Sequence, residues 1–463
     1  STSISVTAPP NAGSLSGSNS SIGVSQTVQL TTSGSAGGNW GSNDASIASV
    51  NSSGLVTGVS VGSTNITYTV AGSGGCSDDV ASYSIAILGS VSSGNWSNSS
   101  IWSGGVKPTA GQNITVLHDI TVDESTADLG NLTINTGTNL SVGAFTLEVS
   151  GTLDNNGTIS IANSSSVVDV DGEYDATGGN TTFSAAGRLQ LRGTATSLGT
   201  LTELTGTVEY DGGTQNVLSE DYYNLVIDQS GNKTAQGVIN IANDMTISNS
   251  ASFLTSTNTI DVSGTTTVGA TLEIDNALYN SRGGFSATGN INFSHGGGKL
   301  RFYTVSPTSL GTLDNTLGTI VYMSGATNVL SDDYYTLTID DGGTAKTLQG
   351  NANIAGNLNI KSGNELNLGS NTMTITGTSD VDGTVNIGTG TYDANGVFDA
   401  TGGSVTFTDA GRLELAGTVT SFGTFTPSTG KVIYNGGAQN VLVENYSNLT
   451  IRGSGVKTAS GNI

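Results

Sequence analysis

The two histidines, His118 and His295, are the residues best suited to proton transfer or metal binding near neutral pH, and they lie far apart in the sequence. A Ser-His-Asp triad or a two-histidine metal site needs both of them, or one with a matched partner, at one place. Their sequence contexts are dissimilar. We therefore expect structural or solvent-exposed roles for both and assign no catalytic residue.

Carboxylates are plentiful, and one acidic pair recurs in front of a tyrosine. The three copies are Glu220-Asp221-Tyr222, Asp332-Asp333-Tyr334 and Glu444-Asn445-Tyr446. A catalytic dyad normally occurs once in a chain, whereas this pair recurs and loses a carboxylate in the third copy, so we interpret it as a turn motif. Calcium binding at exposed turns is the alternative, with the candidate ligands Asp221, Asp332 and Asp333, because that ion prefers oxygen. Neither an EF-hand loop nor a GGxGxD run is present, so we expect no cofactor apart from this calcium alternative.

Trp96 and Trp102 lie close together in the segment from Gly94 to Glu124, which also contains Pro108. Bulky side chains of this kind can cover the apolar end of a stack of strands, so we expect a cap. Indole rings also suit stacking against a sugar, and glycan stacking at Trp96 and Trp102 is the functional alternative.

Basic residues recur at two positions. They are Arg188, Lys299 and Arg412 at the first, and Lys233, Lys346 and Lys457 at the second. A row of cations suits an acidic glycan or the substrate of a lyase. In so acidic a chain, we expect pairing with neighbouring carboxylates instead.

Composition excludes several classes of partner and site. The 36 Asp and Glu residues against 13 Lys and Arg give a net charge of −23, which repels nucleic acid and anionic bilayers. Cys76 is the only cysteine, which excludes an intrachain disulfide and a thiolate-rich metal site, and we expect a small, partly buried thiol. No apolar stretch approaches the ~18 residues of a membrane span, so we expect no direct membrane insertion by this segment.

Three long segments match one another, and they define the architecture that must position these side chains. The segments begin at Arg188, Lys299 and Arg412, and Tyr210, Tyr322 and Tyr434 recur within them at intervals of 112 residues. The spacing changes only at turn-like strings, HGGGKL and YTVSPTS. Residues 126–463 therefore form a repeat array with a 112-residue period. We expect the array to be truncated in mid-repeat at Ile463 and to continue in a longer molecule.

Within each repeat, apolar residues occupy every second position and are interrupted by Gly, Asn or Asp, as in TIDVSGTTTV. This alternation predicts strands joined by tight turns, and no helical stripe is present. The expected fold class is all-β, with the repeats forming a parallel β-helix or solenoid of about five rungs of roughly 20 residues per unit. Tandem β-sandwiches are the alternative. We expect the recurrent Asn side chains to stack inside the coils and to satisfy one another.

Residues 1–88 do not share this period. The string WGSNDASIASVNSSGLVTGVSVGSTNITYTV resembles the bacterial Ig-like domain of group 2, through Trp40, Ala48, Val50, Gly54, Val56, Gly58, Gly62, Ile66 and Tyr68. The resemblance implies a β-sandwich spacer of the kind found in surface adhesins. Its physical interpretation is that Trp40 plugs the core and that Gly54 and Gly62 lie at turns.

Residues 89–125 form a linker and the cap of the solenoid. The string GNWSNSSIWSGGVKPTAGQNITVLHDITVDE, followed by NLTINTGTNLSV, resembles the entry to β-helical segments in large secreted surface proteins of Bacteroidetes. That resemblance implies adhesins of the type IX secretion system, including those used in gliding. It places the protein outside the cell, on the outer face of a Gram-negative bacterium.

Together these features predict a non-catalytic adhesin or stalk that extends a binding region from a bacterial cell and mediates attachment or surface motility. Surface glycans or other cell-surface proteins are the expected partners. The alternatives are a polysaccharide-binding or polysaccharide-degrading β-helix, and an extracellular filament subunit. An enzyme on this scaffold would need a cluster of acids and bases that breaks the repeat symmetry.

Overall fold

A computed structural model describes residues 8–463, and the chain is all-β. The helical segments among these residues are two short 3-10 turns, η1 (Ser99–Ile101) and η2 (Ser103–Gly105). None of the helical segments within this range is long and apolar enough to span a bilayer. The chain divides into two compact units, Ser1–Glu209 and Tyr210–Ile463, which are described separately.

The first unit begins with an Ig-like β-sandwich. Its strands are β1 (Leu15–Ser16), β2 (Ser21–Ile22), β3 (Thr27–Gln29), β4 (Thr31–Thr32), β5 (Asn39–Ser42), β6 (Ala48–Val50), β7 (Leu55–Gly58), β8 (Gly62–Val70) and β9 (Asp79–Ile87). One sheet has the order β2-β9-β8-β5, another has the order β3-β7-β6, and β1 pairs with β4. The predicted sandwich is confirmed.

The core of the sandwich follows from the alternation in its strands. Inward Val28, Val56 and Ile66 are buried, whereas Trp40 is only half-buried and packs at the edge of the core against Tyr68, with ring centroids 4.9 Å apart. Gly54 adopts a φ of +81° in the predicted turn. The predicted turn at Gly62 is wrong, because this residue begins β8.

A parallel β-solenoid follows in the first unit. Its strands are β10 (Gly94–Asn95), β11 (Ile114–Val116), β12 (Ile120–Val122), β13 (Leu132–Ile134), β14 (Asn139–Val142), β15 (Thr146–Val149), β16 (Leu153–Asn155), β17 (Thr158–Ile161), β18 (Val167–Val170), β19 (Tyr174–Asp175), β20 (Asn180–Phe183), β21 (Arg188–Leu191), β22 (Ala195–Ser197) and β23 (Thr200–Thr202), and β24 (Thr207–Tyr210) contains the unit boundary. The sheet orders β10-β12-β14-β17-β20-β23 and β11-β13-β16-β19-β22 show that, from β13 and β14 onwards, every third strand stacks on the same face.

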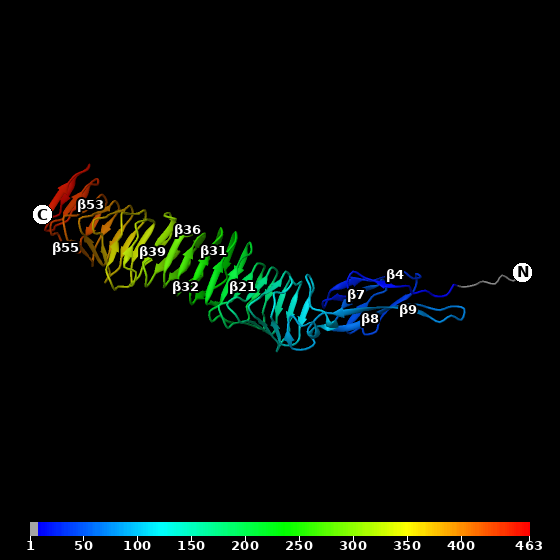
Figure 1. Cartoon of the computed structure of the whole chain (residues 1–463). Helices are drawn as coiled ribbons and strands as arrows, with labels where there is room; N and C mark the ends of the chain where they lie inside the picture. The colour runs from blue at the N-terminus through cyan, green and yellow to red at the C-terminus, as the bar shows by residue number, and fades with distance from the viewer. Residues whose placement is uncertain (1–7) are drawn as a thin grey trace. The chain divides into compact units, whose positions relative to one another are not determined.

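The second unit contains the remaining coils, whose strands are coloured from green to red in Figure 1. Up to the middle of the unit they are β25 (Gln215–Val217), β26 (Asp221–Tyr222), β27 (Asn224–Ile227), β28 (Gly231–Ala235), β29 (Ile239–Ile241), β30 (Met245–Ile247), β31 (Ala251–Leu254), β32 (Thr259–Val262), β33 (Thr266–Val268), β34 (Thr271–Ile274), β35 (Leu278–Ser281), β36 (Phe285–Phe293), β37 (Lys299–Phe302), β38 (Ser309–Leu313), β39 (Thr319–Tyr322), β40 (Asn328–Val329), β41 (Asp333–Tyr334) and β42 (Thr336–Ile339).

The later strands of this unit are β43 (Lys346–Leu348), β44 (Ala352–Ile354), β45 (Leu358–Ile360), β46 (Glu365–Asn367), β47 (Thr372–Ile375), β48 (Ser379–Val381), β49 (Thr384–Ile387), β50 (Thr391–Ala394), β51 (Phe398–Asp399), β52 (Ser404–Phe407), β53 (Arg412–Leu415), β54 (Val419–Ser421), β55 (Thr424–Thr426), β56 (Lys431–Tyr434), β57 (Gln439–Val441), β58 (Asn448–Ile451) and β59 (Lys457–Ala459). An 11-stranded sheet runs β26-β29-β32-β35-β37-β39-β42-β45-β48-β51-β54, and a 7-stranded sheet runs β41-β44-β47-β50-β53-β56-β58.

Alternation along each strand places one residue set inside the coils and the other on the surface. In β42, Leu337 and Ile339 are buried while Thr336 and Thr338 are partly exposed. Leu337 pairs in parallel register with Leu358 in the next coil, so like side chains stack in the interior. The predicted solenoid is confirmed, and the alternative of tandem sandwiches is wrong for the repeats.

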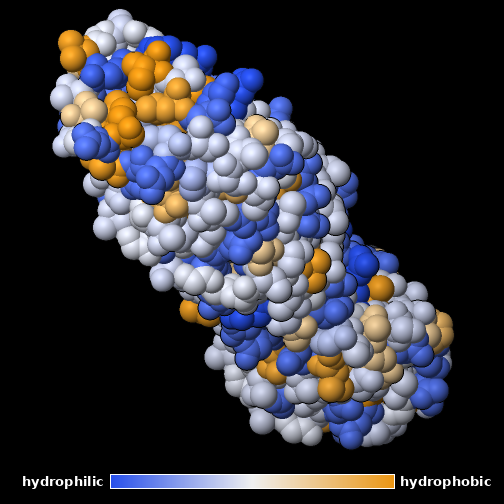
Figure 2. All heavy atoms as spheres, turned by 90° about the vertical axis from the view of Figure 1, so that its left-hand side faces the viewer, coloured by the Kyte–Doolittle hydropathy of each residue, from blue (hydrophilic) through white to orange (hydrophobic). Residues whose placement is uncertain are grey.

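The surface of the solenoid is largely polar but sparsely charged. In the view of Figure 2, most of the visible surface is pale or blue; hydrophobic residues gather at the upper left and are scattered elsewhere. The large hydrophobic side chains that remain exposed are mostly valines. This matches the low content of charged residues, 11% of the chain.

The expectation that Asn side chains stack inside the coils is wrong for many of them. Asn357 lies at a corner, where its Oδ1 accepts the backbone N–H of Thr378 in the next coil at 2.9 Å. Asn351 accepts the N–H of Thr372 in the same way at 2.8 Å. At a corner, the backbone N–H has no partner in a neighbouring strand, and the Asn side chain accepts its hydrogen bond instead. Such unpaired backbone groups are more frequent at corners than in the apolar interior.

Candidate functional site

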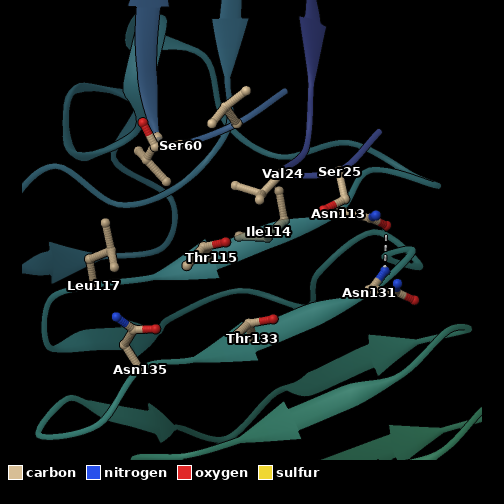
Figure 3. A pocket seen from close by; sticks show the side chains of 12 residues that line it. Val24, Ser25, Ser60, Asn113, Ile114, Thr115, Leu117, Asn131, Thr133 and Asn135 are labelled. Carbon is tan, nitrogen blue, oxygen red and sulfur yellow. Dashed lines mark hydrogen bonds between the residues drawn. The ribbon is translucent and has the colours of Figure 1, made fainter. Parts of the chain in front are cut away.

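The clearest cavity in the first unit is a groove of about 460 Å³ beside β11 and β13 (Figure 3). One wall comes from loops of the Ig-like domain, with Val24, Ser25, Val59, Ser60 and Val61, and the other comes from the first coils of the solenoid, with Asn113, Ile114, Thr115, Leu117, Asn131, Thr133 and Asn135. The size is within the range of small-molecule sites. Its lining contains neither an ionisable nor an aromatic side chain, so it offers only amide and hydroxyl hydrogen bonds and aliphatic contacts.

A glutamine fixes the two walls of this groove to each other. Gln26 Oε1 accepts the N–H of Gly23 at 2.7 Å and the N–H of Asn113 at 3.2 Å, and its Nε2 donates to Gly111 O at 3.2 Å. Gln112 Nε2 donates to Ser21 Oγ at 3.0 Å. These bonds join the Ig-like domain to the first coil. Sequence reasoning missed the groove, because its walls come from segments that are distant in the sequence.

Trp96 and Trp102 lie in the chain segment that leads into the first coils. Each is about 1% exposed, their ring centroids are 4.7 Å apart in an edge-to-face arrangement, and Trp102 Nε1 donates to Trp96 O at 3.0 Å. The Trp96 N–H also donates to Thr121 O in β12. Neither ring has a free face, so the alternative of glycan stacking at these residues is wrong: both indoles are buried, and the indole nitrogen of Trp102 has a hydrogen-bond acceptor inside the protein.

The recurrent acidic pairs surround a buried pair of tyrosines. Tyr322 and Tyr334 have hydroxyl oxygens 3.3 Å apart; Tyr322 Oη accepts the N–H of Leu330 at 3.1 Å, and Tyr334 Oη donates to Leu330 O at 2.8 Å. The pairs Tyr210 with Tyr222 and Tyr434 with Tyr446 make the same contacts in the other two repeats. Each pair therefore binds the backbone N–H and C=O of one loop leucine inside the coil, and we call this arrangement the tyrosine clamp.

Burial changes the ionisation of these groups. Desolvation raises the pKa of Tyr322 to about 12 and raises the pKa of Tyr334 as well. Desolvation, followed by the negative charge of Asp221, raises the pKa of Glu220. Desolvation also raises the pKa of Asp332, although the hydrogen bond from the Asp333 N–H lowers it in part; the negative charge of Asp333 raises it further. The acidic pairs therefore flank the tyrosine clamp.

The calcium candidates form no common ligand group, because Asp221 lies in the first repeat whereas Asp332 and Asp333 are neighbours in the second. Asp221 Oδ1 accepts from Asn240 Nδ2 at 2.7 Å, Asp333 Oδ1 accepts from Asn353 Nδ2 at 2.7 Å, and Asp332 Oδ1 accepts the N–H of Asp333 at 2.8 Å. Within residues 8–463, no three His, Cys, Asp or Glu side chains come together as a metal-ligand group. The motif is also less of a turn than predicted, because Asp221 and Tyr222 form β26, and Asp333 and Tyr334 form β41.

The remaining titratable candidates lie apart from one another. His118 Nδ1 is 3.2 Å from Ser90 Oγ and 3.1 Å from Ser90 O, whereas His295 pairs with Asp275 in the inserted turn. The structure therefore does not bring the two histidines to a common partner. Cys76 is exposed, so the expected partly buried thiol is wrong; it lies in the turn before β9, where no second layer covers it.

The recurrent cations behave in two ways. Arg188 pairs with Glu209 at 2.7 Å as expected, but Lys299 and Arg412 form no ion pair within residues 8–463. Lys346 is fully buried and its Nζ donates to Thr344 O at 3.1 Å, and Lys233 and Lys457 bind backbone carbonyls in the same way. The predicted pairing with carboxylates is therefore wrong for these three lysines, because backbone carbonyl oxygens lie within reach of them at the corners of the coils.

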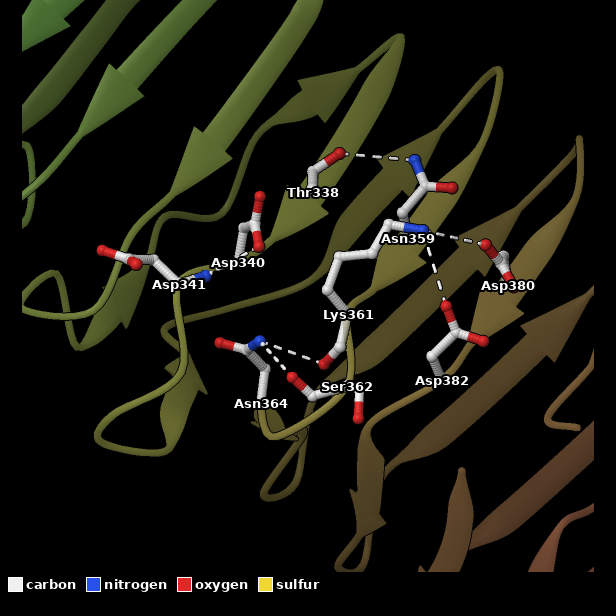
Figure 4. Close-up of polar contacts among 9 residues, drawn as sticks. All are labelled: Thr338, Asp340, Asp341, Asn359, Lys361, Ser362, Asn364, Asp380 and Asp382. Atoms are coloured by element: carbon white, nitrogen blue, oxygen red, sulfur yellow. Dashed lines mark hydrogen bonds and ion pairs between the residues drawn. The ribbon is translucent and has the colours of Figure 1, made fainter. Parts of the chain in front are cut away.

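A charged cluster lies on the 11-stranded sheet (Figure 4). Lys361 Nζ is 3.2 Å from Asp380 and 3.6 Å from Asp382. Desolvation lowers the pKa of Lys361, but the two carboxylates outweigh it and raise the pKa overall. The members are well exposed, so the cluster resembles an ordinary surface ion pair and not an acid-base centre.

Comparison with known proteins adds one match. Residues 2–79 match the model of the bacterial Ig-like domain (group 2). No curated protein matches the chain. The match covers β1 to β8 of the sandwich, in agreement with the resemblance carried by Trp40, Gly54 and Tyr68.

Proposed function

We propose that this chain is a non-catalytic spacer and attachment segment of an extracellular surface protein, in which an Ig-like domain precedes a solenoid that holds binding surfaces away from the cell. The Ig-like match and the parallel solenoid support a surface or extracellular protein. The function is mechanical and adhesive, with no bound cofactor.

The observation that carries this proposal is the recurrence of the tyrosine clamp. A pair of tyrosine hydroxyls holds a backbone loop in each of three repeats, at Leu218, Leu330 and Leu442, and this pair is buried in the first two repeats and partly buried in the third. Buried hydrogen bonds that recur with the architecture serve its rigidity, whereas an active site would occur once. Parallel ladders between coils add a continuous set of backbone hydrogen bonds that resist extension.

The finer assignment is an adhesin of Bacteroidetes, exported by the type IX system to the outer face of a Gram-negative cell and used in attachment or gliding. Its support is the resemblance of residues 94–124 to the entry segments of such proteins. Glycans or proteins on other surfaces would be its partners.

Electron microscopy of purified chains tests the spacer function. Coils stack ~4.8 Å apart, so removal of one 112-residue repeat should shorten the particle by about 27 Å without changing its width. A repeat deletion that collapses the particle, or leaves its length unchanged, would overturn the proposal. Depolymerisation of a polysaccharide by the purified full chain would favour the enzyme alternative.

A further inference from the structure

The second repeat carries a basic patch on its surface. Lys299 and Arg301 are the two outward residues of β37, in the 11-stranded sheet of the second unit. Arg301 pairs in register with Asn280 of β35, and Phe302 pairs with Ser281, so Tyr303 and Arg282 follow side by side. Five polar or aromatic side chains of two adjacent strands therefore share one area of the surface.

The two outward cations of this patch have no anionic partner. Neither Lys299 nor Arg301 forms an ion pair with any residue in the range 8–463, and the buried Nε of Arg301 has no hydrogen-bond acceptor there. Arg301 faces Asn280 on one side and Val321 on the other. The terminal Nη groups of a guanidinium without an anionic partner can bind a carboxylate through two parallel hydrogen bonds.

The neighbouring aromatic ring is held in a fixed position. The Arg282 guanidinium lies 4.7 Å from the centroid of Tyr303, and Arg282 is itself fixed by two bonds to Asp261, at 2.5 Å and 2.6 Å. Tyr303 Oη is 3.4 Å from Asn280 Oδ1. Beneath them Asn280 is only 5% exposed and Val321 only 4%, although both are on the outward side. The patch is therefore a packed layer, organised before any ligand arrives.

This patch breaks the symmetry of the repeats. The position of Arg301 is occupied by Gln190 in the first repeat and by Glu414 in the third, and the position of Tyr303 by Arg192 and Ala416. In the third repeat, Glu414 pairs with Arg452, so charge is neutralised there. A feature that the other repeats lack is not required by the solenoid, which separates it from the recurrent tyrosine clamp.

From this geometry we propose that the patch around Arg301 binds a carboxylated polysaccharide in which acidic sugars are separated by neutral ones. Arg301 and Lys299 lie two residues apart on one strand, about 6.6 Å, and both bind the carboxylate. The Tyr303 ring contacts the neutral sugars. This inference rests on the proposed attachment role and names its ligand class.

Charge argues for this ligand over other polyanions. The chain carries a net charge of −23, and the same sheet continues in one direction to Asp380 and Asp382, so a densely charged polymer such as nucleic acid is repelled. A polysaccharide with spaced carboxylates can place one acid group on the cations and neutral hydroxyls on the acidic surroundings.

The test measures binding of fluorescent hyaluronan, in which carboxylated and neutral sugars alternate, to the full chain by anisotropy. Arg301→Gln and Tyr303→Ala introduce residues that other repeats already carry, so the solenoid tolerates them. We expect Arg301→Gln to weaken binding about tenfold, the effect of losing one charge-assisted contact, and Tyr303→Ala to weaken it severalfold. Added salt should weaken binding of the unsubstituted chain more than that of Arg301→Gln.

Arg412→Gln is the matched control, because it removes the same charge from the third repeat, and it should change binding less than twofold. Equal binding of neutral dextran, equal or tighter binding of poly-glutamate, or hyaluronan binding that Arg301→Gln leaves unchanged would each overturn the proposal. None of these results would alter the length per repeat in electron microscopy, so failure of this inference is distinguishable from failure of the spacer function.

Discussion

Leu300 and Leu413 occupy equivalent positions in successive repeats, yet they lie in different sheets of the solenoid, one in β37 of the 11-stranded sheet and the other in β53 of the 7-stranded sheet. Five coils along the first sheet lead from Leu300 to Phe398, and a sixth leads to Val419. One repeat is thus five coils plus two strands of the next. A surface feature of one repeat, such as the patch at Arg301, faces a different direction from its equivalent in the next.

Replacement of Tyr322 by Phe should loosen the loop at Leu330. The substitution removes the hydroxyl that accepts the Leu330 N–H and leaves this donor buried, which costs about 1–3 kcal/mol. Native-state hydrogen exchange at Leu330 measures the loss of protection. Tyr335→Phe is the control, because Tyr335 is 36% exposed. Unchanged exchange in Tyr322→Phe would contradict the clamp.

The buried tyrosines should make the protein sensitive to alkali. Desolvation raises the pKa of Tyr174, Tyr210 and Tyr322 to about 12 from an ordinary value of 10.0. Because the folded pKa lies above the unfolded one, this stabilisation is complete below pH 10 and is lost as the pH rises towards 12. Urea midpoints should fall across this window, and tyrosinate absorbance should rise with unfolding. Tyr322→Phe should flatten the slope, and an equal slope would refute the assignment.

A column of glycines should be intolerant of alanine. Gly377, Gly396 and Gly417 stack at one corner, where a Cβ on Gly396 would lie 2.0 Å from Gly377 O and a Cβ on Gly417 would lie 1.9 Å from Gly396 O. Gly396→Ala should therefore lower the free energy of unfolding by about 1–3 kcal/mol in urea titrations. Gly437→Ala, where nothing lies within 4 Å, should be near neutral. Equal stability of both variants would show that the backbone at this corner can shift to accommodate the added methyl group.

Loss of Gln26 should separate the Ig-like domain from the first coil. Gln26→Ala removes three hydrogen bonds, two of which reach Gly111 and Asn113 of the solenoid. Limited proteolysis between residues 88 and 113 should then be faster. Gln29→Ala is the control, since Gln29 bonds only within the Ig-like domain, to Leu30 and Ser53. Equal cleavage of the two variants would count against the glutamine bridge.

Calcium should leave the stability unchanged. The candidates Asp221, Asp332 and Asp333 each accept a hydrogen bond and do not converge. Melting temperatures in calcium and in EGTA should therefore agree. A calcium-dependent rise that Asp333→Asn abolishes would revive the site, because an ion that binds only the folded state stabilises it.

Much of the architecture follows from local sequence. Alternation in strings such as TLTI places Leu337 and Ile339 inside because successive side chains of a strand point to opposite faces. The repeat and the Ig-like motif were visible for the same reason: each depends on residue types at fixed spacing. Glycine and asparagine residues indicated where the corners lie, but they did not indicate which atoms they would bind.

Local sequence patterns thus specify the all-β class, the order of its parts and the in-out pattern of each strand. The tertiary structure alone shows which coil lies on which, because coils differ in length, for example 17 residues from Ile320 to Leu337 and 21 from Leu337 to Leu358, and these lengths set the register between strands distant in the chain. That register buries Trp96 and Trp102, leaves Cys76 exposed, pairs Arg188 with Glu209 and leaves Arg301 without an anion. Alternation is a property of neighbouring residues, whereas the partner of a surface charge depends on the length of the intervening turn.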